Sequence, residues 1–360
     1  MIAARHIPAL DGVRGLAAAL VVASHFPSFS LPRLLEPHVG DYGVLLFFIL
    51  SGFLMGYLYL PRTPDREALI VYAAARVARI VPLYACVSLL SFFIFSFIYK
   101  DFVYPIGLPE LIRQGTFTSS VSVFWSIGPE FQFYFLFPFI WALPYAGLKY
   151  RTWLYIVMGG VLVLCYLATP WLPGFSAFAK MHIFIAGILC SLVVHKSSQA
   201  QLDRLFLPLS LFTLLCLALM FFPVPPALEA MIFPSTRHDP KHIVYYNDLL
   251  KIAACTLMIL GATIDHPFNR FFWANPAMRR LGAYSFSLYL IHMPIFQIVT
   301  NIGSAMGISV AMQSALAVTL SLLGAALSHE LFEKPFGQWV RRKMTLTLTK
   351  SRPPSTASTI

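Results

Sequence analysis

Three ionisable side chains lie inside long apolar stretches of this sequence. They are His25, Glu130 and His292. A charged group at the centre of a membrane helix costs about 2.5–3.5 kcal/mol on insertion scales, so such residues usually serve a function. Imidazole accepts a proton near neutral pH, and a carboxylate can orient such a base or bind a substrate hydroxyl. The three residues therefore predict acid–base chemistry within a membrane.

Hydroxyl groups accompany these residues at helical spacing. Ser285, Tyr289 and His292 follow one another by four and then three positions, so a helix would present them in one stripe. Ser126 precedes Glu130 by four positions and would share its face. We expect Ser126, Tyr289 and His292 to donate hydrogen bonds to a substrate or to a developing oxyanion.

The three ionisable residues are expected at one depth. With a rise of 1.5 Å per residue, His25 and His292 each lie about 16 Å inside the basic end of their apolar stretch. Glu130 lies on an oppositely directed stretch and reaches about the same level in a core about 30 Å thick. Each residue alone is equally well explained as a hydrogen bond between helices. The common depth favours a shared site.

Three arginines at the basic ends of two stretches are candidates for binding an anion. Arg76 and Arg79 share a helix face, and Arg14 lies at the same level on another helix. Guanidinium groups bind phosphate bidentately, which suits a donor such as coenzyme A, whose head is rich in phosphate. The alternative is that the arginines only fix the orientation of the helices. Asp11 is either a substrate contact or an acid at a helix N-terminus.

The composition predicts that membrane helices position these groups. Hydrophobic residues make up 58% of the 360 residues and charged residues 11%, whereas soluble domains have about 45–50% and about 25%. We therefore expect an all-α, polytopic transmembrane bundle of about ten spans. The predicted spans are Val13–Phe29, Tyr42–Leu60, Val81–Tyr99, Val121–Leu143, Trp153–Ala168, Phe175–Val194, Leu205–Phe222, Leu249–Ile264, Leu281–Gly303 and Val310–Leu331.

The basic residues predict the orientation. An even number of spans puts both termini on one side, and most Lys and Arg residues fall on that side, which predicts cytoplasmic termini. This bias also explains the net charge of +11 without a nucleic-acid partner. Residues 1–343 are predicted to form the membrane domain, with an irregular Pro-rich loop over Pro223–Asp248, and residues 344–360 a disordered cytoplasmic tail. The five cysteines lie in apolar runs without metal-ligand spacing, so no metal is expected.

Several ordered motifs resemble those of the acyltransferase-3 family of membrane acyltransferases. The matching segments, in the family's order, are Ile7–Phe26 with Arg14 and His25, Phe47–Met55, Arg76–Tyr84, Trp125–Pro138 with Glu130, Ser285–Ile295, and Glu333–Pro335. The sequence departs from the family in the fourth helix, where Phe131 replaces a second acid and Pro129 is unusual.

The resemblance implies a ten-helix enzyme of the bacterial inner membrane. Such an enzyme moves an acyl group, usually acetyl, from acyl-CoA to a hydroxyl of a saccharide. The expected acceptor is a surface polysaccharide or exopolysaccharide, or its lipid-linked precursor; a macrolide or another secondary metabolite is the alternative. Many relatives carry an SGNH-type domain after the last helix, and this sequence is expected to be the stand-alone form. The acyl chain length and homo-oligomerisation remain open.

Roles follow for the candidate residues. His25 is the expected catalytic base, either in direct transfer or through an acyl-histidine intermediate. Glu130 would assist catalysis or bind the acceptor, and Arg14, Arg76 and Arg79 would hold the acetyl-CoA phosphates. A proton-coupled transporter is the rival class, because buried His and Glu residues also form proton relays.

Overall fold

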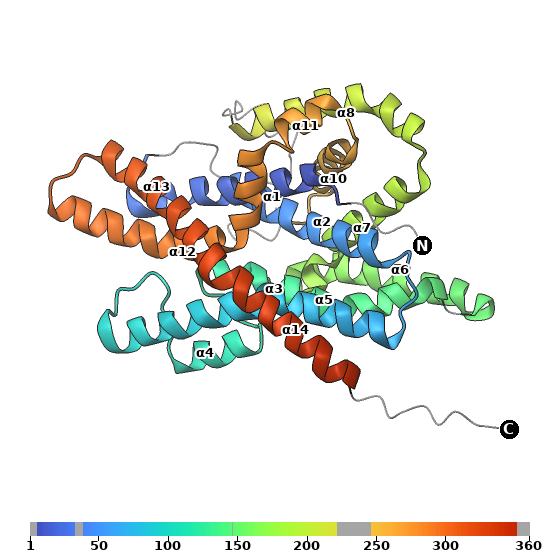
Figure 1. Ribbon diagram of the computed structural model, residues 1–360, viewed down its shortest axis with the longest axis horizontal. Helices are drawn as coiled ribbons and strands as arrows, with labels where there is room; N and C mark the ends of the chain where they lie inside the picture. The colour runs from blue at the N-terminus through green and yellow to red at the C-terminus, as the bar shows by residue number, and fades with distance from the viewer. Residues whose placement is uncertain (1–5, 33–38, 146, 222–245, 351–360) are drawn as a thin grey trace.

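The computed structural model describes residues 6–32, 39–145, 147–221 and 246–350, and these residues form only helices and their connections. Ten helices each overlap one predicted span (Figure 1). They are α1 (Pro8–Ser24), α2 (Val39–Tyr59), α3 (Arg66–Phe93), α5 (Ile127–Ala142), α6 (Leu148–Ala168), α7 (Met181–Lys196), α8 (Gln199–Phe221), α10 (Leu249–Thr263), α12 (Pro276–Ala305) and α13 (Val310–Ser328).

Six helical segments of the described chain are long and apolar enough to cross a membrane. They are Val39–Tyr59, Arg66–Ile98, Phe178–Lys196, Gln199–Ala218, Pro276–Ala305 and Val310–Leu346. Two shorter apolar helical segments, Tyr155–Trp171 and Leu249–Thr263, accompany them. The all-helical class is therefore confirmed, together with apolar helices that indicate a membrane protein, whereas ten crossings with cytoplasmic termini stay a prediction.

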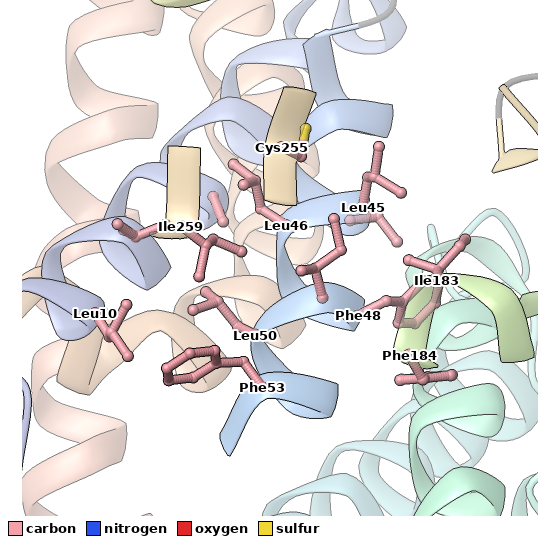
Figure 2. Packing of buried hydrophobic residues seen from close by; sticks show 14 of the residues in the cluster. Leu10, Leu45, Leu46, Phe48, Leu50, Phe53, Ile183, Phe184, Cys255 and Ile259 are labelled. Atoms are coloured by element: carbon pink, nitrogen blue, oxygen red, sulfur yellow. The ribbon is translucent and has the colours of Figure 1, made fainter. Parts of the chain in front are cut away.

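The centre of the bundle is formed by α1, α2, α7, α10 and α12. Pairs α2–α7, α1–α12 and α1–α2 pack along much of their length. Leucine, isoleucine and phenylalanine side chains fill the space between α1, α2, α7 and α10 (Figure 2), among them Leu46, Phe48 and Phe184. These buried side chains hold α1 and α2 in a fixed position, and α1 carries His25 at its C-terminal end.

Short segments join the long helices near the site. The 3-10 turn η1 (Phe26–Phe29) follows α1, and α4 (Leu108–Gly115) and the 3-10 turn η3 (Ser122–Ser126) precede α5. The predicted span Val121–Leu143 includes residues 121–126 as regular helix. The structure instead begins α5 at Ile127, because Ser122 has a positive φ of 43° that an α-helix does not accommodate.

The C-terminal end of the described chain is helical beyond the predicted boundary. The π-turn η9 (His329–Glu333) joins α13 to α14 (Lys334–Lys350), which crosses α3 (Figure 1). Helix α14 therefore includes the first seven residues of the segment predicted to be disordered. The segment after Lys343 contains no Gly or Pro before Pro353, so nothing in its sequence stops the helix at residue 343. Residues 351–360, and residues 223–245 of the predicted Pro-rich loop, lie outside the described residues.

Candidate active site

Two histidines from different helices meet in the bundle. His25 caps the C-terminus of α1 and His292 lies within α12, and their rings are 5.1 Å apart. His292 is fully buried. His25 Nδ1 lies 2.8 Å from the carbonyl oxygen of Val21 and 3.3 Å from His292 Nε2. The structure thus brings together two of the three ionisable residues singled out in the sequence.

The hydrogen-bond partners determine which nitrogen carries the proton in each neutral ring. His292 Nδ1 lies 3.0 Å from the carbonyl oxygen of Leu288, and a carbonyl only accepts, so His292 Nδ1–H donates and its Nε2 is an acceptor. His25 Nδ1–H then donates to the Val21 carbonyl and toward His292 Nε2. His25 is left with a lone pair on Nε2, the atom that a general base uses.

A wide cleft with a volume of about 620 Å³ opens beside His25. Its lining includes His25, Asp41, Trp125, Lys180, Tyr246 and Tyr289. Such a volume is within the range of about 300–1,000 Å³ that is typical of small-molecule sites. The cleft can admit a ligand to the histidine pair.

A narrow pocket with a volume of about 40 Å³ lies next to the wide cleft. Arg14 from α1, Arg79 from α3 and Glu130 from α5 line it, together with Ser126 and Tyr289. Val44 and Tyr289 line both cavities, so the two cavities share a wall. Two guanidinium groups beside one carboxylate give this pocket a net positive character, which suits an anionic ligand.

Glu130 is held by hydroxyl groups at the edge of the narrow pocket. Its Oε1 accepts a hydrogen bond of 2.6 Å from Ser51 Oγ and one of 2.5 Å from Tyr134 OH. The hydrogen bonds of His25 involve Val21 and His292, so it is His292, and not Glu130, that contacts the His25 ring. Glu130 instead shares its cavity with Arg14 and Arg79.

Tyr289 and Ser126 form a hydroxyl pair where the two cavities meet. Tyr289 OH donates to the carbonyl oxygen of Val123 at 2.9 Å and lies 2.7 Å from Ser126 Oγ. Because the phenolic hydrogen is used on Val123, Ser126 donates to the tyrosine oxygen. The predicted stripe of Ser285, Tyr289 and His292 therefore faces the site: Ser285 and Tyr289 line the narrow pocket and His292 contacts His25.

The remaining candidates lie outside the two cavities. The Arg76 guanidinium sits 5.9 Å from the ring centre of Tyr59 and 5.4 Å from that of Tyr134, one helical turn from Arg79. Asp11 forms ion pairs with His6 at 3.1 Å and with Arg14 at 3.8 Å. Asp11 lies in the first turn of α1 but is not its N-cap, which is Ile7. Through the Arg14 contact, Asp11 touches a residue of the narrow pocket.

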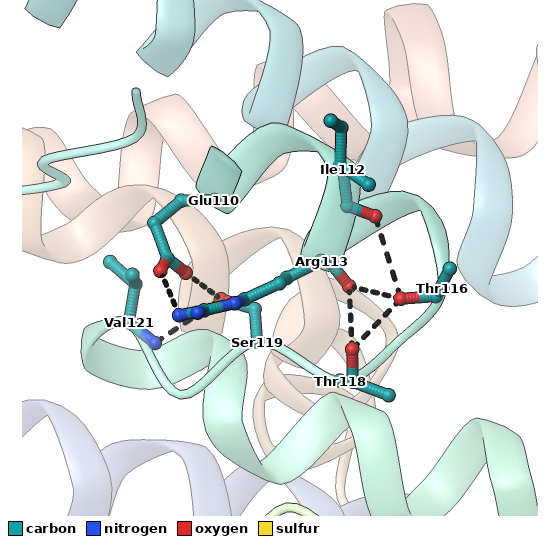
Figure 3. A network of polar contacts seen from close by, with 7 residues as sticks. All are labelled: Glu110, Ile112, Arg113, Thr116, Thr118, Ser119 and Val121. Atoms are coloured by element: carbon teal, nitrogen blue, oxygen red, sulfur yellow. Dashed lines mark hydrogen bonds and ion pairs between the residues drawn. The ribbon is translucent and has the colours of Figure 1, made fainter. Parts of the chain in front are cut away.

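A polar network positions the segment that leads into the wide cleft (Figure 3). Arg113 donates to Glu110 Oε1 at 2.5 Å, and Ser119 Oγ donates to Glu110 Oε2 at 3.4 Å. The backbone N–H of Val121 in turn donates to Ser119 Oγ at 3.3 Å. These bonds fasten residues 119–121 to α4 and thereby place Ser120 and Ser122 in the lining of the wide cleft.

Sequence reasoning missed Asp41, Lys180 and Tyr246, which line the wide cleft. Lys180 was detectable, because it is a charged residue inside the predicted span Phe175–Val194. Asp41 directly precedes a predicted span, where a charge is ordinary, and Tyr246 falls in the predicted irregular loop. Among the described residues, no group of three or more His, Cys, Asp or Glu side chains is arranged to hold a metal ion.

Known proteins resemble this chain over most of its length. The acyltransferase-domain model of the acyltransferase-3 family matches residues 7–329. The peptidoglycan O-acetyltransferase OatA of Listeria monocytogenes is 24% identical over 92% of this chain and 56% of its own length. The O-acetyl transferase of Shigella phage Sf6 is 26% identical over 91% of this chain and 95% of its own length.

A third relative is named an acyltransferase rather than an O-acetyltransferase. The acyltransferase MdmB of Streptomyces mycarofaciens is 22% identical over 91% of both chains. This chain thus spans only about half the length of some relatives, such as OatA, and nearly all of others. No solved structure matches the chain significantly. Because the family model matches residues 7–329, which include the histidine pair and the arginine-lined pocket, this chain belongs to the acyltransferase-3 family.

Proposed function

We propose that this protein is a membrane O-acetyltransferase that moves an acetyl group from acetyl-CoA to a hydroxyl of a saccharide. The observation that carries the proposal is the lone pair on His25 Nε2 beside the wide cleft, with an arginine-lined pocket on the other side of the shared wall. The narrow pocket offers two arginines to one anionic or polar group of such a donor, and a bulkier acceptor fits the wide cleft.

Arg14 and Arg79 hold the donor in this proposal. Both line the narrow pocket, where a phosphate or the polar arm of coenzyme A can receive their N–H groups. Arg76 lies one turn away from Arg79 on the same helix, packed against Tyr59 and Tyr134, and adds positive charge near the pocket. Glu130 keeps Ser51 and Tyr134 in place beside the donor arm, so its role is positioning.

The reaction then needs one base. His25 Nε2 takes the proton from the acceptor hydroxyl as its oxygen attacks the thioester carbonyl carbon. The carbon–sulfur bond breaks, the coenzyme A thiolate recovers the proton from His25, and the acetyl ester and free thiol are released. Tyr289 lies where the cavities meet and is the hydroxyl placed to stabilise the oxyanion, if it exchanges the Val123 carbonyl for that partner.

Related proteins support a saccharide acceptor, and the apolar helices support a membrane location. Two relatives are named peptidoglycan O-acetyltransferase and O-acetyl transferase. By analogy, we propose an acetyl donor for this chain, with a surface saccharide or its lipid-linked precursor as the acceptor. The apolar helices and the basic bias of one side support the bacterial inner membrane with cytoplasmic termini.

The experiment measures acetyl transfer by the purified chain in lipid nanodiscs. Acetyl-CoA labelled in its acetyl group is supplied with a panel of saccharides, and ester formation is followed with release of the free thiol. His25→Ala is expected to lower the rate by about 10²–10⁴-fold, which is the usual contribution of a general base.

His195→Ala is the matched control, because His195 is an exposed histidine stacked on Tyr57 at the far end of α7. Normal turnover in His25→Ala at equal protein levels would remove His25 from the mechanism. Uptake of a saccharide into vesicles without cleavage of acetyl-CoA would instead support the transporter.

A further inference from the structure

Lys180 is a buried cation in the wall of the wide cleft, and the mechanism does not use it. Only 3% of the residue is exposed, yet it lines the cleft. Its ammonium lies 4.2 Å from the ring centre of Tyr246 and 5.9 Å from that of Trp125. Among the described residues, the ammonium has aromatic neighbours but no hydrogen-bond acceptor. A buried ammonium is costly unless a ligand or partner receives its N–H groups.

Asp41 supplies a carboxylate to the same cleft. It lies in the first turn of α2, and its Oδ1 accepts a hydrogen bond of 2.9 Å from Tyr246 OH. Tyr246 therefore contacts both charged groups: its hydroxyl binds Asp41 and its ring faces the Lys180 ammonium. A carboxylate accepts hydrogen bonds from hydroxyl groups, and an ammonium donates to their oxygens. The pair can bracket adjacent hydroxyls of one ligand.

Two aromatic rings border these groups. Trp125 and Tyr246 are 5.4 Å apart and inclined by 67°, and both line the cleft. An aromatic face beside an acid and a base is suited to the C–H face of a pyranose ring, whose edge carries the hydroxyls. Ser28 and Ser120 are exposed at the rim, with Ser122 close by, and the described structure gives their side chains no hydrogen bond.

The charges of the cleft limit the kind of sugar. Among its described lining residues, Asp41 and Lys180 are the acid and the strong base, so their charges cancel. A uronic acid or sugar phosphate would bring a second negative charge next to Asp41, and Lys180 is the one strong base among the described lining residues that could offset it. A neutral sugar ring brings no charge that the Asp41 carboxylate would repel.

We propose that the wide cleft is a saccharide subsite that holds one neutral pyranose ring of the acceptor between Asp41, Lys180 and the Trp125–Tyr246 pair, next to His25 Nε2. The inference rests on the proposed function, because it names the acceptor class for that site. It assigns acceptor affinity to residues that differ from the donor-binding arginines.

The test compares acceptor and donor kinetics in nanodiscs. The acceptors are neutral trisaccharides of glucose, galactose and N-acetylglucosamine, with trigalacturonic acid as the anionic probe. Lys180→Met and Asp41→Asn are each expected to raise the KM for the neutral acceptor by about 10- to 100-fold, the loss of a hydrogen bond to a charged group. The KM for acetyl-CoA should not change, because the arginines that hold the donor lie in the other cavity.

Matched variants separate binding from folding. Lys196→Met removes a lysine at the other end of α7 and should leave the acceptor KM unchanged. Trp125→Phe should keep most of the affinity, whereas Trp125→Ala should lose about tenfold or more, because only alanine removes the aromatic face against which the sugar ring packs. An unchanged acceptor KM in both Lys180→Met and Asp41→Asn would overturn the subsite. Preference for trigalacturonic acid would overturn its neutrality.

A binding measurement keeps the two proposals distinguishable. Radiolabelled neutral trisaccharide is titrated onto the nanodiscs without acetyl-CoA. Binding that Lys180→Met and Asp41→Asn abolish would support the subsite even if no acetyl transfer occurs, in which case only the proposed function fails. Acetyl transfer with binding that both variants retain would overturn the subsite and leave the proposed function standing.

Discussion

The two histidines have different tasks because their ring nitrogens have different partners. His292 Nδ1–H donates to the Leu288 carbonyl of its own helix, and His292 Nε2 accepts from His25. His25 Nδ1–H donates to the Val21 carbonyl and toward His292 Nε2, so the lone pair on His25 Nε2 has no partner among these groups. In the proposed mechanism, His292 is therefore a positioning residue that fixes the orientation and the tautomer of His25.

The role of His292 predicts a graded effect of substitution. His292→Ala should lower kcat by about 10- to 100-fold with little change in either KM, because a small misplacement of the base costs about that much. His292→Gln keeps an acceptor where Nε2 lies and should recover much of the rate. Steady-state kinetics of the two variants in nanodiscs check this. Equal losses in both, or none in His292→Ala, would contradict the positioning role.

Arg79 and Arg76 differ in whether they reach the narrow pocket. Arg79 lines the narrow pocket, whereas Arg76 packs against two tyrosine rings. We expect Arg79→Ala to raise the KM for acetyl-CoA by about 10- to 100-fold, from the loss of a charge-assisted hydrogen bond, and Arg76→Ala to raise it less. Initial rates at varied acetyl-CoA measure both.

The arginine control lies away from the pocket. Arg113→Ala removes a guanidinium from α4, where it pairs with Glu110 outside the pocket, and should leave the donor KM unchanged. A larger effect of Arg76→Ala than of Arg79→Ala would place the donor phosphates one helical turn away from the pocket.

At the scale of the elements, glycines allow the helices that carry the histidines to touch. A methyl group added to Gly282 on α12 would collide with the Asp11 carbonyl of α1. Close backbone approach through small residues is the usual means of packing membrane helices. The contact sets the separation of α1 and α12, and with it the distance between His25 and His292.

Gly282→Ala is therefore expected to destabilise the bundle. The overpacking cost is about 1–3 kcal/mol, and thermal unfolding of the detergent-solubilised protein should show it as a lower Tm. Gly159→Ala on α6 is the control, since the structure places no atom within 4 Å of its added methyl group and alanine favours helix. An unchanged Tm for Gly282→Ala would mean that α1 and α12 can separate freely.

The closing motif has a structural explanation at the same scale. Glu333 Oε2 accepts a hydrogen bond of 2.6 Å from Ser287 Oγ and lies 3.2 Å from His329 Nδ1. Ser287 lies on α12 between Ser285 and Tyr289. Glu333 thus fastens the π-turn before α14 to the helix that carries the site, and it touches neither cavity.

At the scale of the whole molecule, the cavities imply a direction across the membrane. The arginine-lined pocket should open toward the cytoplasm, where acetyl-CoA is made available, and the wide cleft toward the other side. The positive-inside bias predicts the same orientation from the connecting segments.

Single-cysteine labelling tests this orientation. In a variant whose five cysteines are replaced, Ser120→Cys at the rim of the wide cleft should react with a membrane-impermeant maleimide in intact cells. Ala200→Cys, in the first turn of α8, should react only after the membrane is opened. The reverse pattern would invert the topology and contradict a cytoplasmic donor.

The sequence by itself determined the helical class, the approximate helix positions and the family. Apolar runs, basic flanks and motif order are local features, and local features suffice for these conclusions. Each of the ten predicted spans overlaps a helix, whereas α4, the 3-10 start at Ser122 and the helix beyond Lys343 were not predicted. Their formation depends on tight turns and on packing against other helices, such as α14 on α3.

Only the tertiary structure decided which residues act together. His25 and His292 are 267 positions apart and form a pair because glycines bring α1 and α12 into contact. Glu130 had been expected near His25 but lies with the arginines, since depth along a helix says nothing about the face that a side chain takes in the bundle. Asp41, Lys180 and Tyr246 meet for the same reason, because contacts between distant segments depend on how the helices pack.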